Sequence, residues 1–182
     1  MKKSIILFAL VGLSTMAIAQ KKQTTTSATI NFDATTSLDK LPKADNKTVV
    51  ASLDTKTGNV AFESIVKSFT FSNPKMQEHF NGEKWMDSEK YPTATFTGKI
   101  GDLKAVNFKK DGIYNVAVMG DLTLHGVTKP IKTKAVITVA GKLISTKTDF
   151  TIALADYGVN GGAIAAGKVA TNPKITVVAD FK

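Results

Sequence analysis

Two histidines and one aspartate are the side chains best suited to acid–base chemistry in this sequence. His79 lies in a segment with helical apolar spacing, His125 lies in a Leu-His-Gly turn, and Asp156 directly precedes Tyr157. Proton transfer needs such a group in a defined position beside a reacting atom. No serine lies in a nucleophile elbow, and no carboxylate pair has a defined spacing. We therefore expect structural histidines, and we predict that the chain is not an enzyme.

Metal and cofactor sites are not supported by the residue types either. The chain has no cysteine, which excludes disulfides and thiol catalysis and removes the commonest soft metal ligands. Neither histidine has a second ligand at zinc spacing. The stretch from Gly158 to Gly167 is not followed by the lysine-serine/threonine pair of a phosphate-binding loop, and no βαβ pattern surrounds it. We predict no metal and no cofactor.

A group of soft and aromatic side chains is the better candidate for binding. Met76, Phe80, Trp85, Met86 and Tyr91 follow one another within a short segment. Methionine adapts its shape, and Trp and Tyr join an apolar ring to one polar atom. Such residues form either a packed plug or the greasy entrance of a pocket. The sequence leaves both interpretations open.

The segments that must position these residues have a repeat of two. Over residues 93–100, Ala94, Phe96, Gly98 and Ile100 alternate with threonines and a lysine, so one face is apolar and the other polar. Similar patterns predict strands near residues 30–32, 49–53, 60–62, 65–71, 114–124, 131–139, 150–154 and 175–181. Residues 20–27 have no apolar period, and we expect them to be flexible.

Turns and one helix separate the predicted strands. Asn73-Pro74 predicts the start of a helix, and Asn81-Gly82 predicts its end. Asp111-Gly112 predicts a type I′ hairpin after a strand at Val106 and Phe108, and residues 140–142 predict a weaker turn. The connection 155–172 is long enough to be functional or mobile, and we expect it at one end of the fold.

Eight or so short strands joined by tight turns predict an all-β antiparallel barrel or sandwich. An eight-stranded barrel is either filled by its own side chains or holds one small ligand. Gly98, Gly120, Ala94, Ala135 and Ala179 fall on the inward rows. They would leave room along the axis, although small residues also serve to fit a taper. The residues alone leave both interiors open.

The first residues are typical of an export signal. Lys2 and Lys3 precede an apolar run from Ile5 to Val11, and residues 17–19 match the small-x-small pattern of a cleavage site. We therefore expect a signal peptide over 1–19 that is cleaved after Ala19, a single domain over 20–182, and a periplasmic or secreted protein. A retained anchor is the alternative, but the run is shorter than the roughly 20 residues of a spanning helix.

The charge pattern does not favour nucleic acid as a partner. The formal net charge is +9 and every basic residue is a lysine, whereas base and phosphate recognition favour the planar guanidinium of arginine. The lysines are mostly scattered, which is typical of a solvated surface. Weak attraction to anionic lipid headgroups is compatible with this charge.

Two long motifs resemble the YceI-like family. Residues 89–96 read EKYPTATF and residues 120–130 read GDLTLHGVTKP, in the order and spacing of that family. The helix that carries Met76, Glu78, His79 and Phe80 is similar to the family's helix, and so is the Tyr157-Gly158 step. The resemblance covers roughly residues 65–181.

The resemblance implies an exported bacterial protein with an eight-stranded, lipocalin-like, up-and-down antiparallel barrel and a short helical insertion. It also implies an isoprenoid or related long-chain amphiphile inside the barrel, which favours a cavity over a filled core. The chain departs from the family at two places where many members have arginine, namely near Met76-Gln77 and at residues 153–155. The resemblance therefore does not fix the headgroup of the ligand.

These arguments predict one ligand site inside the barrel. The expected apolar cavity and portal residues are Phe62, Phe69, Phe71, Met76, Phe80, Trp85, Met86, Phe96, Val116, Val118, Leu122, Leu124, Phe150, Ile152 and Leu154, with His79, His125 and Tyr157 at the mouth.

The leading function is to sequester or carry a lipid. The alternatives are a barrel enzyme that acts on a lipid, with His79, His125 or Asp156 as acid or base, and a filled-barrel stress-response or surface protein. Homodimer formation and transient contact with a membrane surface stay open.

Overall fold

Alternating apolar and polar side chains give each long strand of this chain one face to bury, and the strands bury it by closing on themselves. The computed structural model describes residues 22–182, so the predicted signal peptide lies outside the described residues. Its strands are β1 (Lys22–Asp33), β2 (Lys43–Asp54), β3 (Asn59–Ile65), β4 (Thr70–Phe71), β5 (Thr93–Ile100), β6 (Gly112–Leu124), β7 (Val127–Ala140), β8 (Leu143–Thr151) and β9 (Lys174–Phe181).

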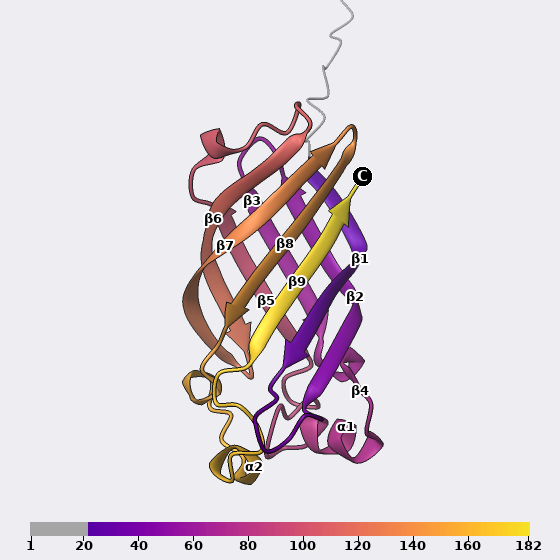
Figure 1. The fold of residues 1–182 in the computed structure, drawn as a ribbon, viewed down its shortest axis with the longest axis vertical. Helices are drawn as coiled ribbons and strands as arrows, with labels where there is room; N and C mark the ends of the chain where they lie inside the picture. Colours follow the sequence, from indigo (N-terminus) through magenta and orange to yellow (C-terminus); the bar gives the residue numbers. More distant parts are fainter. Residues whose placement is uncertain (1–21) are drawn as a thin grey trace, which may run out of the picture.

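Eight of these strands form a closed antiparallel barrel (Figure 1). Each strand pairs with the next long strand along the chain, and β1 pairs with both β2 and β9. Phe32 marks this seam, because it lies opposite Ala44 of β2 and Ile175 of β9. The two-residue strand β4 pairs with β2 outside the eight-strand ring. The prediction of an eight-stranded up-and-down barrel is confirmed.

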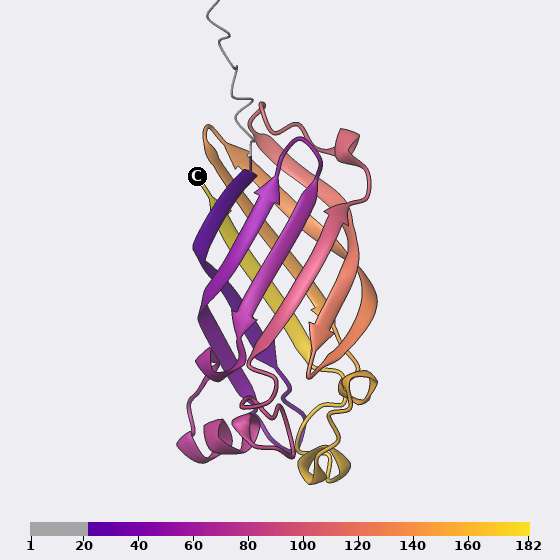
Figure 2. The same ribbon diagram turned by 180° about the vertical axis from the view of Figure 1, so that it is seen from behind.

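The connections differ sharply between the two ends of the barrel (Figures 1 and 2). At the upper end of Figure 1 lie the start of β1, the end of β9 and the connections 55–58, 101–111 and 141–142, with the 3₁₀ helix η2 (Leu103–Ala105). At the lower end lie the connections 34–42, 66–92, 125–126 and 152–173. These lower connections carry η1 (Val66–Ser68), α1 (Pro74–Asn81), η3 (Leu154–Tyr157) and α2 (Gly162–Ala165).

Helix α1 begins and ends where the sequence predicts. The Asn73 side chain accepts hydrogen bonds from the backbone N–H groups of Lys75 and Met76, Pro74 occupies the first turn, and Gly82 is the C-cap. Both ends of this short helix are thus capped, which is needed because an isolated helix of this length is not stable in water.

The tightest turn at the lower end joins β6 to β7. His125 and Gly126 have φ angles of 51° and 74°, and Leu124 lies opposite Val127 in the ladder. Two successive left-handed residues are the mark of a type I′ turn, whose twist matches that of the strands. A Cβ atom on Gly126 would lie 2.5 Å from the Tyr91 ring. Glycine is therefore required both by φ and by space.

Four local predictions are wrong. Residues 22–27 belong to β1, because their backbone pairs with β2 from Lys22 opposite Asp54 onward. Residues 65–71 do not form one strand, since η1 separates β3 from β4. Asp111-Gly112 does not form a hairpin turn: η2 and a loop precede β6, and Val106 is buried in the core beneath them. Strand β8 ends at Thr151, and Leu154 lies in η3.

The apolar interior consists of two clusters stacked along the barrel. The upper cluster includes fully buried Leu53, Ile100, Ile137 and Phe181, with Val106 packed beneath the 101–111 connection. The lower cluster includes residues of the strand ends and of the lower connections, namely Phe32, Ala34, Ala44, Val66, Phe71, Phe80, Met86, Ile152, Leu154, Tyr157, Val159 and Ile175.

Candidate ligand-binding site

A cavity of about 170 Å³ lies inside the barrel. Its wall is formed almost entirely by apolar side chains of both clusters. Ile131 and Ile137 of β7 both line it, and at roughly 3.4 Å per residue they are about 20 Å apart along the strand. The cavity is therefore long for its volume, a shape that suits a linear chain better than a compact ring system.

Strand register determines which side chains reach this cavity. Phe62 of β3 lies opposite Phe96 of β5, which lies opposite Leu122 of β6, and all three line the cavity. Because successive side chains of a strand point to opposite faces, the residues two positions away share this inward direction. One apolar band thus crosses three neighbouring strands.

Of the two roles that the sequence leaves open for the small inward residues, Gly98 and Gly120 do not open space in the cavity. Gly98 lies opposite Gly120, and the Phe96 ring lies against both of them. A Cβ atom would lie 2.4 Å from the Phe96 Cζ atom at Gly98 and 2.8 Å from it at Gly120. The two glycines accommodate an aromatic ring along the wall, so the space that they free is already occupied.

The wall formed by β7 and β8 is partly polar. Thr133, Thr146 and Thr148 line the cavity. The Thr133 and Thr148 hydroxyl oxygens are 3.0 Å apart, and Thr148 donates to the Lys134 carbonyl oxygen at 2.8 Å. The Thr146 hydroxyl donates to the Ala179 carbonyl oxygen at 3.3 Å. These hydroxyls have partners within the wall, so an apolar chain could cover them without leaving them unpaired.

An aromatic plug, which we define as Phe69, Phe71, Phe80 and Phe32, closes the lower part of the barrel. The ring centroid of Phe80 is 4.9 Å from that of Phe71, 5.7 Å from that of Phe69 and 6.1 Å from that of Phe32. These separations and the tilted ring planes are within the favourable range for aromatic pairs.

Gln77 ties α1 to this plug. Its side-chain carbonyl oxygen accepts a hydrogen bond from the Phe71 N–H at 3.0 Å, and its side-chain amide donates to the Phe69 carbonyl oxygen at 2.6 Å. One glutamine thus satisfies two backbone groups of the segment that carries the plug. Phe69 and Phe80 lie outside the strand ladder, whereas Phe32 and Phe71 belong to β1 and β4, which both pair with β2.

The connection 152–173 packs against the remaining side of the lower end. The His125 Nδ1 atom is 3.0 Å from the Tyr157 carbonyl oxygen, and the His125 ring meets the Tyr91 ring at 4.6 Å between centroids. Burial, and then the charge of Asp156, raise the pKa of the Tyr157 hydroxyl. Through its contact with Tyr157, His125 links the β6–β7 turn to the connection 152–173.

Trp85 makes a second contact with the connection 152–173. A Cβ atom on Gly161 would lie 2.8 Å from the Trp85 ring, so the indole lies directly against the backbone of residues 152–173. Through this contact the segment after α1 and the connection before β9 form one continuous cover.

Most of the predicted site residues surround the cavity. The wall includes Phe62, Phe69, Phe80, Met86, Phe96, Val118, Leu122, Leu124, Phe150, Ile152 and Leu154. Four others lie outside the wall: Val116 is buried in the upper cluster, Phe71 in the lower cluster, and Met76 and Trp85 pack against the lower cluster.

The three predicted mouth residues have different environments. His79, His125 and Tyr157 all lie outside the cavity wall: His79 is exposed on α1, His125 lies in the β6–β7 turn, and Tyr157 is buried in the lower cluster. The sequence prediction missed the threonines of β7 and β8, although Thr133 stands in the inward row 131–139. Their polarity hid them, since only apolar residues were considered as wall candidates.

Among residues 22–182, no group of three or more His, Cys, Asp or Glu side chains is arranged to hold a metal ion. None of the helices described there has the length and apolar character needed to cross a membrane.

Comparison with known proteins places this barrel among others of its kind. A UPF0312 protein of Vibrio vulnificus is 40% identical over 77 residues, which cover 42% of this chain and 36% of the relative. A UPF0312 protein of Pseudomonas syringae pv. tomato is 32% identical over 112 residues, covering 58% of this chain and 55% of the relative. The matched regions therefore span little more than half of these relatives at most.

Two solved structures share the fold over most of their length. A polyisoprenoid binding domain from Saccharophagus degradans implicated in plant cell wall breakdown matches with a TM-score of 0.74 at 18% identity, covering 90% of this chain and 98% of that one. Burkholderia cenocepacia BcnA matches with a TM-score of 0.69 at 19% identity, covering 84% and 96%.

The sequence model of the YceI-like domain matches residues 14–181, which include every strand of the barrel. Both motifs that suggested the resemblance fall within this range. The chain therefore belongs to the YceI-like family.

Proposed function

We propose that this protein is an exported carrier that holds the tail of a long-chain amphiphile, such as an isoprenoid, inside its barrel. The observation that carries the proposal is the long apolar cavity between the two clusters. The similarity to a polyisoprenoid binding domain supports the ligand class. Family membership and this neighbour favour a binding protein over an enzyme. Export is proposed from the signal pattern of residues 1–19.

Burial of the tail supplies the affinity. About 20 carbons at roughly 0.8 kcal/mol per methylene give a gross transfer free energy of about 16 kcal/mol from water. Ordering of the chain and loss of its freedom on association reduce this value. A donor membrane reduces it further, because the tail is already in an apolar medium there. Selectivity then depends on cavity length and on the few polar groups near the wall.

The size of the cavity adds a requirement for entry. A cavity of roughly 150 Å³ accepts benzene, and the present one is close to that volume. A tail of about 20 carbons needs several times more space, so it must displace side chains. Phe69 and Phe80 of the aromatic plug are the part that can move, since they line the cavity but belong to connections outside the barrel ladder. The tail therefore enters from the lower end.

Occlusion of the cavity tests the proposal. Val118→Trp should fill part of the cavity and so weaken binding of a long fluorescent prenyl or acyl probe to delipidated protein. The expected loss is tenfold or more, which corresponds to about 1.4 kcal/mol or more. Thr97→Trp, on the exposed outer face of β5, should leave affinity unchanged. Equal affinities of the two variants would refute an intrabarrel site. Native mass spectrometry of protein purified from its own host identifies the lipid.

Two measurements separate this proposal from its alternatives. A lipid enzyme would turn over the bound molecule, and His125→Gln would abolish turnover with the fold intact. A filled-barrel surface protein would carry no lipid after purification. The mass of the mature N-terminus tests export: a species that keeps residues 5–11 would contradict cleavage after Ala19.

A further inference from the structure

The connection 34–42 exposes two large apolar side chains at the lower end of the barrel. Leu38 is 73% exposed and Leu41 is 51% exposed. Beside them, the connection that contains α2 exposes Ala165 and Ala166. We call residues 34–42 and 161–170 together the lip.

The two parts of the lip are joined. The Ala170 N–H donates to the Ala34 carbonyl oxygen at 2.8 Å. A Cβ atom on Gly167 would lie 3.4 Å from a Leu38 methyl group. Leu38 therefore lies beside the second connection while most of its surface stays exposed.

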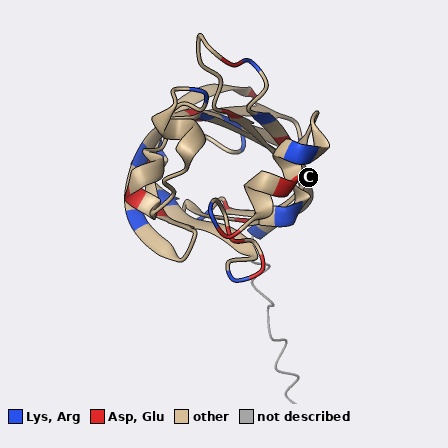
Figure 3. Ribbon diagram, turned by 90° about the horizontal axis from the view of Figure 1, so that it is seen from below, with Lys and Arg blue, Asp and Glu red and all other residues tan. Residues whose placement is uncertain are grey.

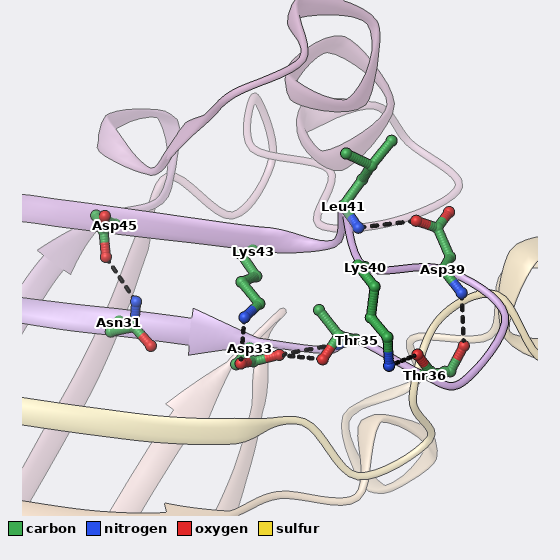
Figure 4. Close-up of polar contacts among 9 residues, drawn as sticks. All are labelled: Asn31, Asp33, Thr35, Thr36, Asp39, Lys40, Leu41, Lys43 and Asp45. Atoms are coloured by element: carbon green, nitrogen blue, oxygen red, sulfur yellow. Dashed lines mark hydrogen bonds and ion pairs between the residues drawn. The ribbon is translucent and has the colours of Figure 1, made fainter.

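Several polar groups of the leucine-bearing loop are hydrogen-bonded within it (Figure 4). The Thr36 hydroxyl oxygen accepts from the N–H groups of Leu38 and Asp39, both at 3.1 Å, and the Thr36 N–H donates to the Asp39 carbonyl oxygen at 2.8 Å. The Asp39 carboxylate accepts from the Leu41 N–H at 2.8 Å, and the Lys40 ammonium donates to the Thr36 carbonyl oxygen at 2.6 Å. These hydrogen bonds lower the free-energy cost of removing water from around the backbone of the loop.

The base of the same loop is anchored to the barrel. The Asp33 carboxylate accepts from the Thr35 N–H at 3.0 Å and from the Thr35 hydroxyl at 2.7 Å, and it lies 3.2 Å from the Lys43 ammonium. The Ala34 N–H donates to the Pro42 carbonyl oxygen at 2.8 Å. The leucines are thus presented on a fixed support, which lowers the entropy lost when they bind.

The lip is continuous with the entry end of the cavity. Phe32 and Leu154 line the cavity. Phe32 lies near the end of β1, just before the lip segment 34–42, and Leu154 lies in η3, earlier in the connection that contains the lip segment 161–170. Within the lip, Ile164, Val169 and Ala170 pack against the lower cluster. These apolar contacts form a path from the lip residues beside Leu38 to the lower cluster, part of which lines the cavity.

We propose that the lip docks this protein on a lipid bilayer, with Leu38 and Leu41 inserted among the lipid headgroups and acyl chains. Its role in lipid transfer rests on the proposed function, but docking itself can be measured without a cavity ligand. The path described above would then allow a tail to pass from bilayer to barrel with little exposure to water.

Size and charge favour a bilayer over a protein partner. A stable protein interface buries roughly 800 Å² on each side, far more than two leucines and two alanines provide. The lip carries two basic residues, Lys40 and Lys168, and one acidic residue, Asp39. The Asp39 carboxylate accepts a hydrogen bond from the Leu41 N–H. Lysines beside exposed leucines suit an anionic membrane surface. Around the rest of the lower end, basic and acidic residues are interspersed (Figure 3).

Vesicle flotation with delipidated, mature protein tests the lip. The vesicles contain phosphatidylcholine mixed with phosphatidylglycerol. Leu38→Ser/Leu41→Ser should lower the partition coefficient about tenfold or more, because most of the inserted apolar area is lost. Ile113→Ser/Met119→Ser is the matched control, since Ile113 is 71% and Met119 46% exposed. Ile113 lies at the upper end of β6 (Figure 1). The control should bind within about twofold of the unaltered protein, as it leaves the lip intact.

Three outcomes would overturn the docking proposal. They are an unaltered protein that does not float with vesicles, equal losses in both double variants, and a dimer that sedimentation velocity shows to dissociate in Leu38→Ser/Leu41→Ser. The last result would assign the lip to a second copy of this chain.

Probe binding in solution keeps the two proposals distinct. Leu38→Ser/Leu41→Ser should bind the fluorescent probe normally, and Val118→Trp should still float with vesicles. Flotation without probe binding by any form would refute the carrier function and leave docking intact. Probe binding without flotation would do the reverse.

Discussion

The two ends of this barrel are closed by different kinds of contact. At the upper end, short connections cover a core in which Leu53, Ile100, Ile137 and Phe181 are fully buried between ladder-paired strands. At the lower end, long connections bring an aromatic plug that is held by ring contacts and by Gln77. The upper end is thus held by the strand ladder, and the lower end is the one through which we propose that a ligand enters. Entry by displacement of Phe69 and Phe80 would leave the strand pairing of the barrel intact.

The largest effect should come from the upper core. Phe181→Ala should lower the free energy of unfolding by about 3–5 kcal/mol, because it leaves a cavity where the surrounding strands cannot collapse. Phe69→Ala in the plug should cost clearly less, as Phe69 is only partly buried and borders space that is already empty. Denaturant unfolding measures both. Equal losses would mean that the two ends are equally rigid.

A backbone change at the lower end should come next. Gly126→Ala should cost about 1–3 kcal/mol of stability, since its left-handed φ is strained for other residues and its methyl group would meet the Tyr91 ring. Affinity for the probe should fall little in the folded fraction. The thermal midpoint and the dissociation constant are compared. Unchanged stability with lost binding would make Gly126 part of the ligand site instead.

Release of the plug should have a smaller effect on stability and a larger one on kinetics. Gln77→Ala leaves two backbone groups of the plug segment without their partner and should cost about 1–2 kcal/mol. It should also speed probe entry, because α1 no longer holds Phe69 and Phe71. Stopped-flow fluorescence measures the rate, with Glu78→Ala, exposed on the same helix, as the control. Identical entry rates would show that the plug is not the gate.

The smallest effect concerns the support of the lip. Burial raises the pKa of the Asp33 carboxyl, but hydrogen bonds from Thr35 and the nearby Lys43 outweigh this and lower it below 3.8. Its stabilising contribution is therefore present above pH 3.8 and is lost as the pH falls through the lower folded value. Because Asp33 is partly exposed, Asp33→Asn should cost at most about 1 kcal/mol at neutral pH. A pH-independent difference from the unaltered protein would refute this linkage.

Strand periodicity made the barrel wall predictable. The row from Phe96 to Ile100 alternates strictly between apolar and polar residues, and alternation places a side chain inside or outside whatever its neighbours are. Helix α1 was equally clear, because Asn73, Pro74 and Gly82 act locally. These features depend on contacts between residues close in sequence.

The lower end could not be predicted in the same way. The aromatic plug joins Phe32 to Phe80, although β2, β3 and β4 lie between them in sequence, and Gln77 has no local sequence signal for its role. Residues 22–27 look unstructured by composition, yet their partner strand β2 fixes them in the barrel. The sequence could not decide the role of the glycine pair at 98 and 120, because the position of the Phe96 ring depends on packing.

The seam of the barrel also sets the order of its assembly. Strand β1 finds its second partner only in β9, the last strand in chain order. Closing so long a loop costs entropy that no local contact repays, so barrels rich in distant pairings fold slowly. Hairpins such as β6–β7 can form early, whereas the seam must wait for β9. If the chain is exported as we propose, slow closure of the seam would help to keep it unfolded until it has crossed the membrane.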